Sequence, residues 1–178
     1  MRLKWPGFSD DGTVLIELSP ETFCLAKHAV DIGGEYFVAK EELHITLVGS
    51  KLGSMILNKI KSDRTINNLL KNTFEEINWS YQATDIVHIL SRLKDGLIEK
   101  SIILPLDMPG LAGFYDQLKL HGIIDTVTPI PPAHVTLYTH NCPLGIGVSS
   151  YEDLKTLCSK TLPLSELDKR CRAGGSDG

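Results

Sequence analysis

The sequence predicts a mixed fold of strands and helices, organised as two related lobes of one domain. Its 178 residues are enough to bury a core, and its composition, 42% hydrophobic and 22% charged, is that of a folded globular protein. One order of elements occurs twice: strand, proline-started helix, glycine, His-x-Thr-Leu strand, helix. We therefore expect an internal duplication, with one lobe at roughly residues 13–80 and the other at roughly 81–172.

The first lobe is expected to open with a strand at residues 13–18, where branched residues alternate. Ser19 and Pro20 suit the cap and first turn of a helix, which we expect to continue to about residue 30 and to end at the pair Gly33-Gly34. A second alternating strand is predicted at 42–48.

Helical segments follow from about residue 54 to residue 77. In their later part, apolar residues recur at helical spacing and define one buried face: Ile66, Leu69, Leu70, Phe74 and Ile77.

The second lobe is expected to begin with a hairpin of strands at 79–93 and 97–106, joined by a turn at Lys94-Asp95-Gly96. A helix at 111–120 and an alternating strand at 133–138 come next. Ser149 to Glu152 resembles a capping box, which predicts a last helix through about Lys160. Residues 173–178 are expected to form a disordered tail.

Charge limits the kinds of partner. Eighteen Lys and Arg against 22 Asp and Glu give a net charge of −4, without the basic excess of a surface that holds duplex nucleic acid or an anionic membrane. We expect no binding to duplex DNA or to membranes, whereas a small anionic ligand remains compatible. No apolar run approaches the roughly 20 residues of a membrane helix, and no secretory signal is visible. A cytoplasmic monomer is expected.

The cysteines point to the same compartment. They show neither CxxC spacing nor the density of a disulfide scaffold, so reduced and mostly buried thiols are expected at all four positions: Cys24, Cys142, Cys158 and Cys171.

The two His-x-Thr strands carry the candidate chemistry. Because side chains alternate across a strand, His44 and Thr46 share one face while Ile45 and its neighbour Leu47 face a core. The same alternation places His134 and Thr136 together. If the lobes oppose each other, two imidazoles and two hydroxyls flank one site.

This set of groups suits displacement at phosphorus, where the attacking and leaving oxygens lie on opposite sides. One imidazole can act as base and the other as acid, because the ordinary pKa of histidine is about 6.5. The threonine hydroxyls can hold the non-bridging oxygens as charge grows on them.

Competing interpretations are weaker. A zinc site is disfavoured, because the sequence has no HExxH and no cysteines spaced as ligands beside these strands. Gly145-Ile146-Gly147 is too short for a dinucleotide-binding loop. The remaining histidines are interpreted as structural or surface residues: His28, His88, His121 and His140.

His44-Ile45-Thr46-Leu47 and His134-Val135-Thr136-Leu137 resemble the paired His-x-Thr/Ser-x signatures of the 2H phosphoesterase superfamily. That group includes RNA 2′,3′-cyclic phosphodiesterases, 2′-5′ RNA ligase-like proteins and phage enzymes that destroy cyclic oligonucleotide alarm signals. The resemblance spans roughly residues 13–160. It implies a bilobal α+β fold, with two pseudo-symmetric lobes whose antiparallel sheets face a central groove and whose helices lie outside.

The resemblance also implies roles. His44 and His134 would be the general acid and base, in either order, Thr46 and Thr136 would hold the phosphate, and no metal or other cofactor would be required. Two further residues are candidates for substrate binding. Tyr138 is expected on the face of His134, where it would stack on a base or bind a ribose. Lys51 would reach a phosphate. Trp79 and Tyr81 are interpreted as core or hairpin residues.

The expected activity is therefore hydrolysis of a nucleotide phosphodiester. The substrate would be a 2′,3′-cyclic phosphate end of RNA, a 2′-5′ linkage or a small cyclic oligonucleotide. One alternative is a phage-type enzyme that degrades cyclic oligonucleotide immune signals. Another is a non-catalytic protein that binds nucleotides or RNA ends.

Overall fold

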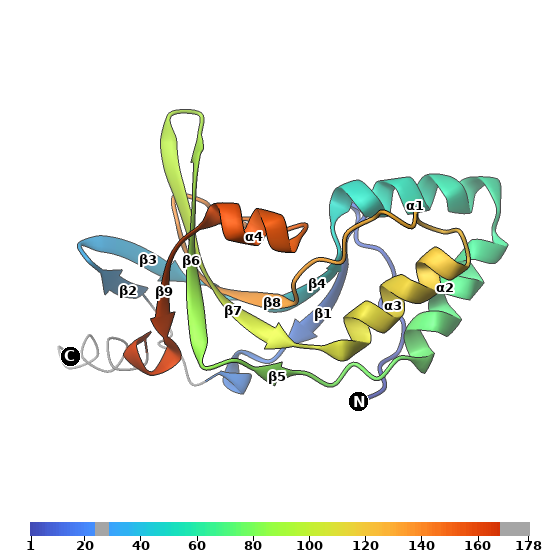
Figure 1. Cartoon of the computed structure of the whole chain (residues 1–178), viewed down its shortest axis with the longest axis horizontal. Helices are drawn as coiled ribbons and strands as arrows, with labels where there is room; N and C mark the ends of the chain where they lie inside the picture. Colours follow the sequence, from blue (N-terminus) through green and yellow to red (C-terminus); the bar gives the residue numbers. More distant parts are fainter. Residues whose placement is uncertain (24–28, 168–178) are drawn as a thin grey trace.

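The computed structural model describes residues 1–23 and 29–167, which form an α+β fold around an open antiparallel sheet (Figure 1). The main path of the sheet runs β1-β4-β8-β7-β6-β9, and the shorter strands β2, β3 and β5 pair beside it. The nine strands are β1 (Val14–Leu18), β2 (Ala29–Ile32), β3 (Glu35–Ala39), β4 (Leu43–Val48), β5 (Gln82–Ala83), β6 (Ile86–Lys94), β7 (Leu97–Asp107), β8 (His134–His140) and β9 (Cys158–Pro163).

The helices gather in two places. Three of them lie together at one end of the molecule, on the right in Figure 1, and the last lies over the upper side of the strands β6 to β8. They are α1 (Ser50–Ser62), α2 (Thr65–Glu76), α3 (Pro109–Leu120) and α4 (Tyr151–Leu157), with a short 3-10 helix η1 (Pro20–Thr22) after β1. No described helix has the length and apolar character needed to span a bilayer.

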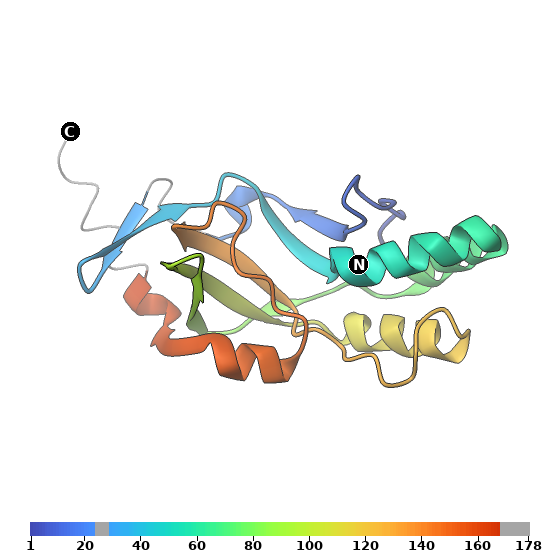
Figure 2. The ribbon, with the colours of Figure 1, turned by 90° about the horizontal axis from the view of Figure 1, so that it is seen from above.

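The two His-x-Thr strands are neighbours in the sheet. β4 and β8 are antiparallel, with Ile45 paired to Val135. The other neighbour of β4 is β1 from the first half of the chain, and β8 also pairs with β7 from the second half. β3 pairs with β8 as well, so the two halves of the chain meet along β8. Figure 2 shows the cyan strand β4 beside the orange strand β8.

One large apolar core holds the sheet and helices together. The apolar face predicted in the second helical segment is confirmed, since Leu70 and Phe74 of α2 are fully buried there. Trp79 is also fully buried, and its indole N–H donates to the Phe74 carbonyl at 2.8 Å, which confirms its interpretation as a core residue. Tyr115 of α3 donates to the Leu47 carbonyl at 3.0 Å and so fastens the helices to β4.

The helix predicted at residues 20–30 is wrong. Ser19 does cap a helical turn, because its hydroxyl accepts from the Glu21 amide, but that turn ends at Thr22. Residues 24–28 lie outside the described part, and β2 then pairs with β3 as a hairpin. The pair Gly33-Gly34 forms its turn with φ of +68° and +86°. Two adjacent residues with positive φ suit a two-residue hairpin turn, so the glycines join strands instead of ending a helix.

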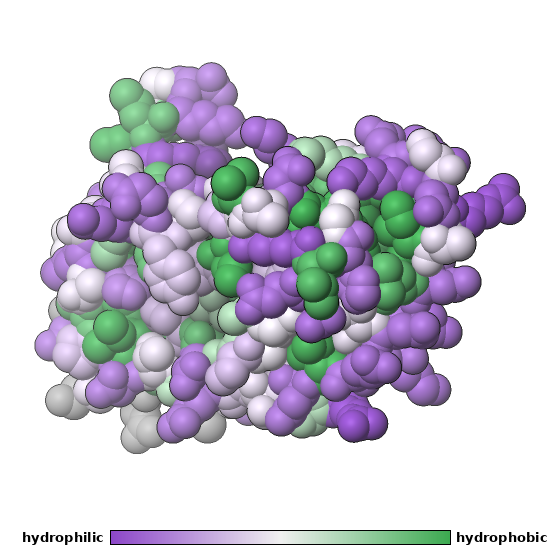
Figure 3. Space-filling model, turned by 45° about the vertical axis from the view of Figure 1, so that its right-hand side comes forward, coloured by the Kyte–Doolittle hydropathy of each residue, from purple (hydrophilic) through white to green (hydrophobic). Residues whose placement is uncertain are grey.

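The predicted hairpin and its turn are confirmed, with Asp95 and Gly96 at positive φ between β6 and β7. Its first strand, predicted from residue 79, begins only at Ile86, and the short β5 before it is a separate strand. Its turn end stands away from the rest of the molecule (Figure 1), and Figure 3 shows hydrophobic surface there beside hydrophilic surface. Leu93, Leu97 and Ile98 are 74%, 60% and 53% exposed in this region.

The last predicted helix is shorter than expected. Ser150 caps α4 by accepting from the Asp153 amide at 3.0 Å, as the sequence indicates, but the helix ends at Leu157. The segment that follows is β9, which pairs with β6. Most of its residues are exposed, so it lacks the apolar alternation by which a strand is recognised. The predicted tail at 173–178 lies outside the described residues.

Candidate active site

Strand β4 presents His44 and Thr46 on one face of the sheet. Both side chains are half-buried, whereas Ile45 and Leu47 between and beyond them are fully buried in the core. The alternation predicted for this strand is confirmed. Neighbouring β1 contributes Glu17 across from His44, and this carboxylate is exposed on the same face.

Strand β8 presents the second motif in the same way. His134 and Thr136 are half-buried, and Val135 and Leu137 are buried in the core. Ile45 pairs with Val135, and both of these side chains face the core. The residues that flank this pair, His44 and Thr46 on β4 and His134 and Thr136 on β8, therefore lie on the opposite face of the sheet. The four side chains, called here the motif side chains, form one group on one face of the sheet.

The ring of His134 is oriented by the backbone. Its Nδ1 lies 2.8 Å from the Pro132 carbonyl oxygen, which only accepts, so Nδ1 carries the proton. Nε2 is then the nitrogen that exchanges a proton with a ligand. Burial lowers the pKa of His134, the Pro132 carbonyl raises it, and the charge of His44 lowers it further, with a net lowering. The two imidazoles therefore interact electrostatically.

More charged side chains act on His44 than on His134. Burial is the largest cause that lowers its pKa, and the positive charge of Lys40 lowers it further. The carboxylates of Glu42 and Glu17 act in the opposite direction, but the net pKa stays below its ordinary value. Both imidazoles are therefore neutral at neutral pH in the free protein. A bound anion would favour a proton on one of them, which is the state that acid–base catalysis needs.

A loop at residues 142–148 lies beside Thr136. A Cβ built on Gly145 would lie 3.2 Å from Thr136 Cγ2 and 3.4 Å from its Oγ1, so only a glycine approaches this closely without a shift. Gly145 also has φ of +84°, which L side chains rarely adopt. The Gly145-Ile146-Gly147 segment therefore borders the motif side chains. From the sequence, this segment was judged too short for a dinucleotide-binding loop and was not predicted as part of a site.

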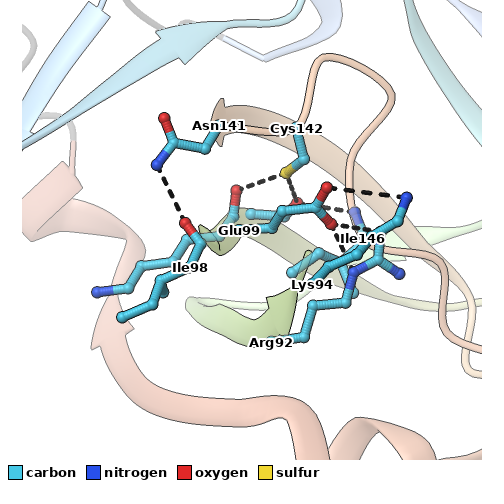
Figure 4. Close-up of polar contacts among 9 residues, drawn as sticks. Arg92, Lys94, Ile98, Glu99, Asn141, Cys142 and Ile146 are labelled. Atoms are coloured by element: carbon cyan, nitrogen blue, oxygen red, sulfur yellow. Dashed lines mark hydrogen bonds and ion pairs between the residues drawn. The ribbon is translucent and has the colours of Figure 1, made fainter. Parts of the chain in front are cut away.

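Buried polar contacts hold this loop on strand β7 (Figure 4). The Ile146 amide donates to Ser101 Oγ at 2.8 Å, and Cys142 Sγ donates to the Lys100 carbonyl at 3.0 Å. Ile146 and Cys142 also belong to a second apolar cluster, which packs against α4. The loop is thus fixed on the sheet at the edge of the motif side chains.

The substrate-binding role expected of Tyr138 is wrong. Tyr138 is fully buried in the main core and offers no surface for stacking. The reason is a bulge in β8: Ile103 of β7 pairs with Thr136, but the preceding residue, Ile102, pairs with Tyr138. The extra residue reverses the alternation, so Tyr138 joins Ile102 on the core face instead of following Thr136.

Lys51 lies in the first turn of α1, after β4, and its side chain is exposed. Its contact with a phosphate stays a prediction. The cation that acts on His44 is Lys40, in the bend between β3 and β4. Lys40 was not predicted as a site residue. It lies four residues before His44 in the sequence, but this spacing does not show how close the two side chains are until the path of the bend is known.

The other histidines have their own partners. The His88 ring lies 3.4 Å from Cys158 Sγ, and His140 Nδ1 lies 2.8 Å from the Tyr36 carbonyl. His121 is exposed at the end of α3, and His28 lies outside the described residues. Within residues 1–23 and 29–167, no three His, Cys, Asp or Glu side chains are grouped closely enough to hold a metal ion.

Two surface hollows lie elsewhere. One of about 590 Å³ is lined by α1 and α2, including Lys61, Arg64 and Asn68, and one of about 420 Å³ is lined by residues near β5, including Asp85 and Asp107. Neither is lined by a motif side chain.

Comparison with models of known protein families, with curated proteins and with solved structures gives no match for this chain.

Proposed function

We propose that the chain is a metal-independent phosphodiesterase of the 2H type that cleaves a nucleotide phosphodiester. The observation that carries the proposal is the shared face of the motif side chains: two half-buried imidazoles and two half-buried threonines from neighbouring strands. Both imidazoles titrate below the ordinary pKa of histidine and are electrostatically coupled. Such a pair supplies an acid and a base to one small anionic group.

Each group has a definite task in the proposed reaction. With an oligonucleotide, one imidazole removes the proton of the substrate's 2′-hydroxyl, whose oxygen attacks phosphorus. The bond from phosphorus to the 5′-oxygen breaks, and the second imidazole protonates that oxygen as it leaves. The product is a 2′,3′-cyclic phosphate. Water then opens the ring with the two roles exchanged, so each imidazole returns to its starting protonation state.

The threonines and the loop complete the site. Thr46 and Thr136 donate to the non-bridging oxygens, where negative charge grows during the attack. The 142–148 loop narrows the site on the side of Thr136. This layout favours a small substrate, such as a 2′,3′-cyclic phosphate end or a small cyclic oligonucleotide, and a net charge of −4 is compatible with that choice.

The bilobal organisation is part of the proposal. It is supported by the sheet order, in which β4 with β1 and β8 with β7 form two antiparallel pairs that join at the motif strands. We further propose that the protein acts as a monomer, because both imidazoles come from one chain. We also propose that it acts in the cytoplasm, as the sequence predicts.

A turnover assay tests the function. The protein is incubated with a 2′,3′-cyclic nucleotide and with a panel of cyclic di- and trinucleotides, with and without EDTA, and products are identified by mass and phosphate position. We expect turnover of at least one substrate class, unaffected by EDTA. His44→Ala and His134→Ala should each lose about 100- to 10,000-fold in rate. His121→Ala, which changes an exposed histidine, is the matched control and should keep full activity.

Full activity in either motif variant would contradict the proton-transfer roles. Tight nucleotide binding without any turnover would instead identify a binding protein.

A further inference from the structure

Lys40 joins two parts of the candidate site. It lies where the chain bends from β3 into β4, and both of these strands lie against β8. Its backbone amide donates to the Leu137 carbonyl of β8 at 2.9 Å, and its ammonium donates to the Pro143 carbonyl of the 142–148 loop at 2.9 Å. One residue thus contacts the strand that carries Thr136 and the loop that borders it.

The ammonium of Lys40 has capacity for a ligand. The side chain is half-buried, and within the described residues it forms no ion pair with a carboxylate within 4.0 Å. The Pro143 carbonyl uses one of its three N–H donors, so two remain. An ammonium that has no anionic partner among the described residues, contacts the loop next to Thr136 and acts electrostatically on His44 suits a phosphate oxygen.

We propose that Lys40 is a phosphate-binding and positioning residue of this site: its ammonium contacts a non-bridging oxygen beside His44 while it holds the 142–148 loop against Thr136. The inference rests on the proposed function for its substrate, but its contacts are those of the free protein. It assigns to Lys40 the phosphate contact that the sequence suggested for Lys51.

The electrostatics of His44 agree with this assignment. Four charged or titratable groups act on or face the His44 ring: Lys40 and Glu42 from the bend, Glu17 from β1 and His134 from β8. Of these, Lys40 is the one that lowers the pKa of His44, and the two carboxylates raise it. Removal of the Lys40 charge should therefore raise the pKa of His44.

Three substitutions of Lys40 distinguish the effect of its charge from the effect of its hydrogen bond to the 142–148 loop. Lys40→Met removes both the charge and the donor to Pro143. Lys40→Gln removes the charge but keeps an N–H donor, and Lys40→Arg keeps both. Lys71→Met is the matched control, because it removes an exposed lysine from α2 that has no part in the candidate site.

Two readouts do not depend on turnover. The imidazole signals of His44 are followed by NMR, first against pH and then against inorganic phosphate. We expect Lys40→Met and Lys40→Gln to raise the pKa of His44 and to weaken phosphate binding by about 10- to 100-fold, the loss expected for a charged hydrogen bond. Lys40→Arg should restore most of both effects, and Lys71→Met should change neither. Where turnover is measurable, KM should rise more than kcat falls.

The two proposals fail in different ways. If the wild type turns over a nucleotide but Lys40→Met and Lys40→Gln keep wild-type phosphate affinity and His44 pKa, the role of Lys40 is overturned and the enzyme stands. If the pKa and phosphate affinity change as expected but no substrate is turned over, the role of Lys40 stands and the phosphodiesterase is overturned. If Lys40→Gln matches the wild type and only Lys40→Met is impaired, Lys40 anchors the loop without binding phosphate.

Discussion

Ile45 of β4 pairs with Val135 of β8, and both side chains face the core. The His-x-Thr side chains that flank this pair therefore lie together on the opposite face of the sheet. If the two motifs form one site, as proposed, this relationship has consequences that can be measured.

If the two histidines act on the same phosphate, the rate losses caused by replacing each one should not multiply in the double variant. The double variant His44→Ala/His134→Ala should be about as slow as the slower single variant, because removal of either group already stops concerted proton transfer. Single-turnover rates of the three variants measure this. Rate losses that multiply in the double variant would mean that the imidazoles act independently.

The hydroxyls should matter less than the imidazoles. Thr46→Val and Thr136→Val keep the shape of the side chain and remove one hydrogen bond to a charged oxygen, so we expect rates to fall by about 10- to 100-fold. Thr161→Val, on an exposed position of β9, serves as the control and should have wild-type kinetics. The hydroxyl role is refuted by wild-type kinetics in both motif variants.

The pH dependence follows from the direction of the pKa shifts. Burial disfavours the charged form of both imidazoles, so each accepts its proton only at a pH below the ordinary value of about 6.5. Because one imidazole must be charged and the other neutral, kcat/KM should follow a bell-shaped profile. Its maximum should lie below pH 6.5, with a decline as pH rises and the acid loses its proton.

This profile is measured for the free enzyme at substrate concentrations far below KM. A flat profile between about pH 5 and 8, or a maximum above pH 8, would contradict the pairing of a charged and a neutral imidazole.

The close approach of Gly145 to Thr136 predicts a local effect on stability. Gly145→Ala forces a side chain into a left-handed conformation, which costs about 1–2 kcal/mol, and pushes its Cβ against Thr136. We expect a lower unfolding free energy in denaturant titration. Gly147→Ala is a matched control, because a Cβ there meets open space, and its stability should equal that of the wild type. Equal stability of both variants would mean that the loop moves away from Thr136 without cost.

The sequence allowed the strands and their faces to be predicted, but not how they meet. Branched residues on alternate positions identify the strands that carry His44 and His134, because half-buried strands have this pattern wherever they lie. The register between β4 and β8 depends on contacts 90 positions apart and is set by the whole sheet. The bulge that turns Tyr138 into the core has no sequence signal of its own, so strict alternation placed that residue on the wrong face.

Some short sequence patterns occur in two different kinds of local structure, and such a pattern led to a wrong prediction here. A glycine pair ends helices and turns hairpins, and only the pairing of β2 with β3 decides between the two. Lys40 and Gly145 were missed as site residues for a related reason. Each approaches the motif side chains through a bend or a loop, whose path depends on distant partners, Leu137 for Lys40 and Ser101 for the loop.

Whether both imidazoles bind one phosphate group is measured most directly by an NMR titration of the wild-type protein with inorganic phosphate at pH 6.5. The ring signals of His44 and His134 should shift together along one saturation curve, while those of His121 stay unchanged. A shift of only one motif histidine, separate curves for the two, or no shift of either at saturating phosphate would contradict the claim.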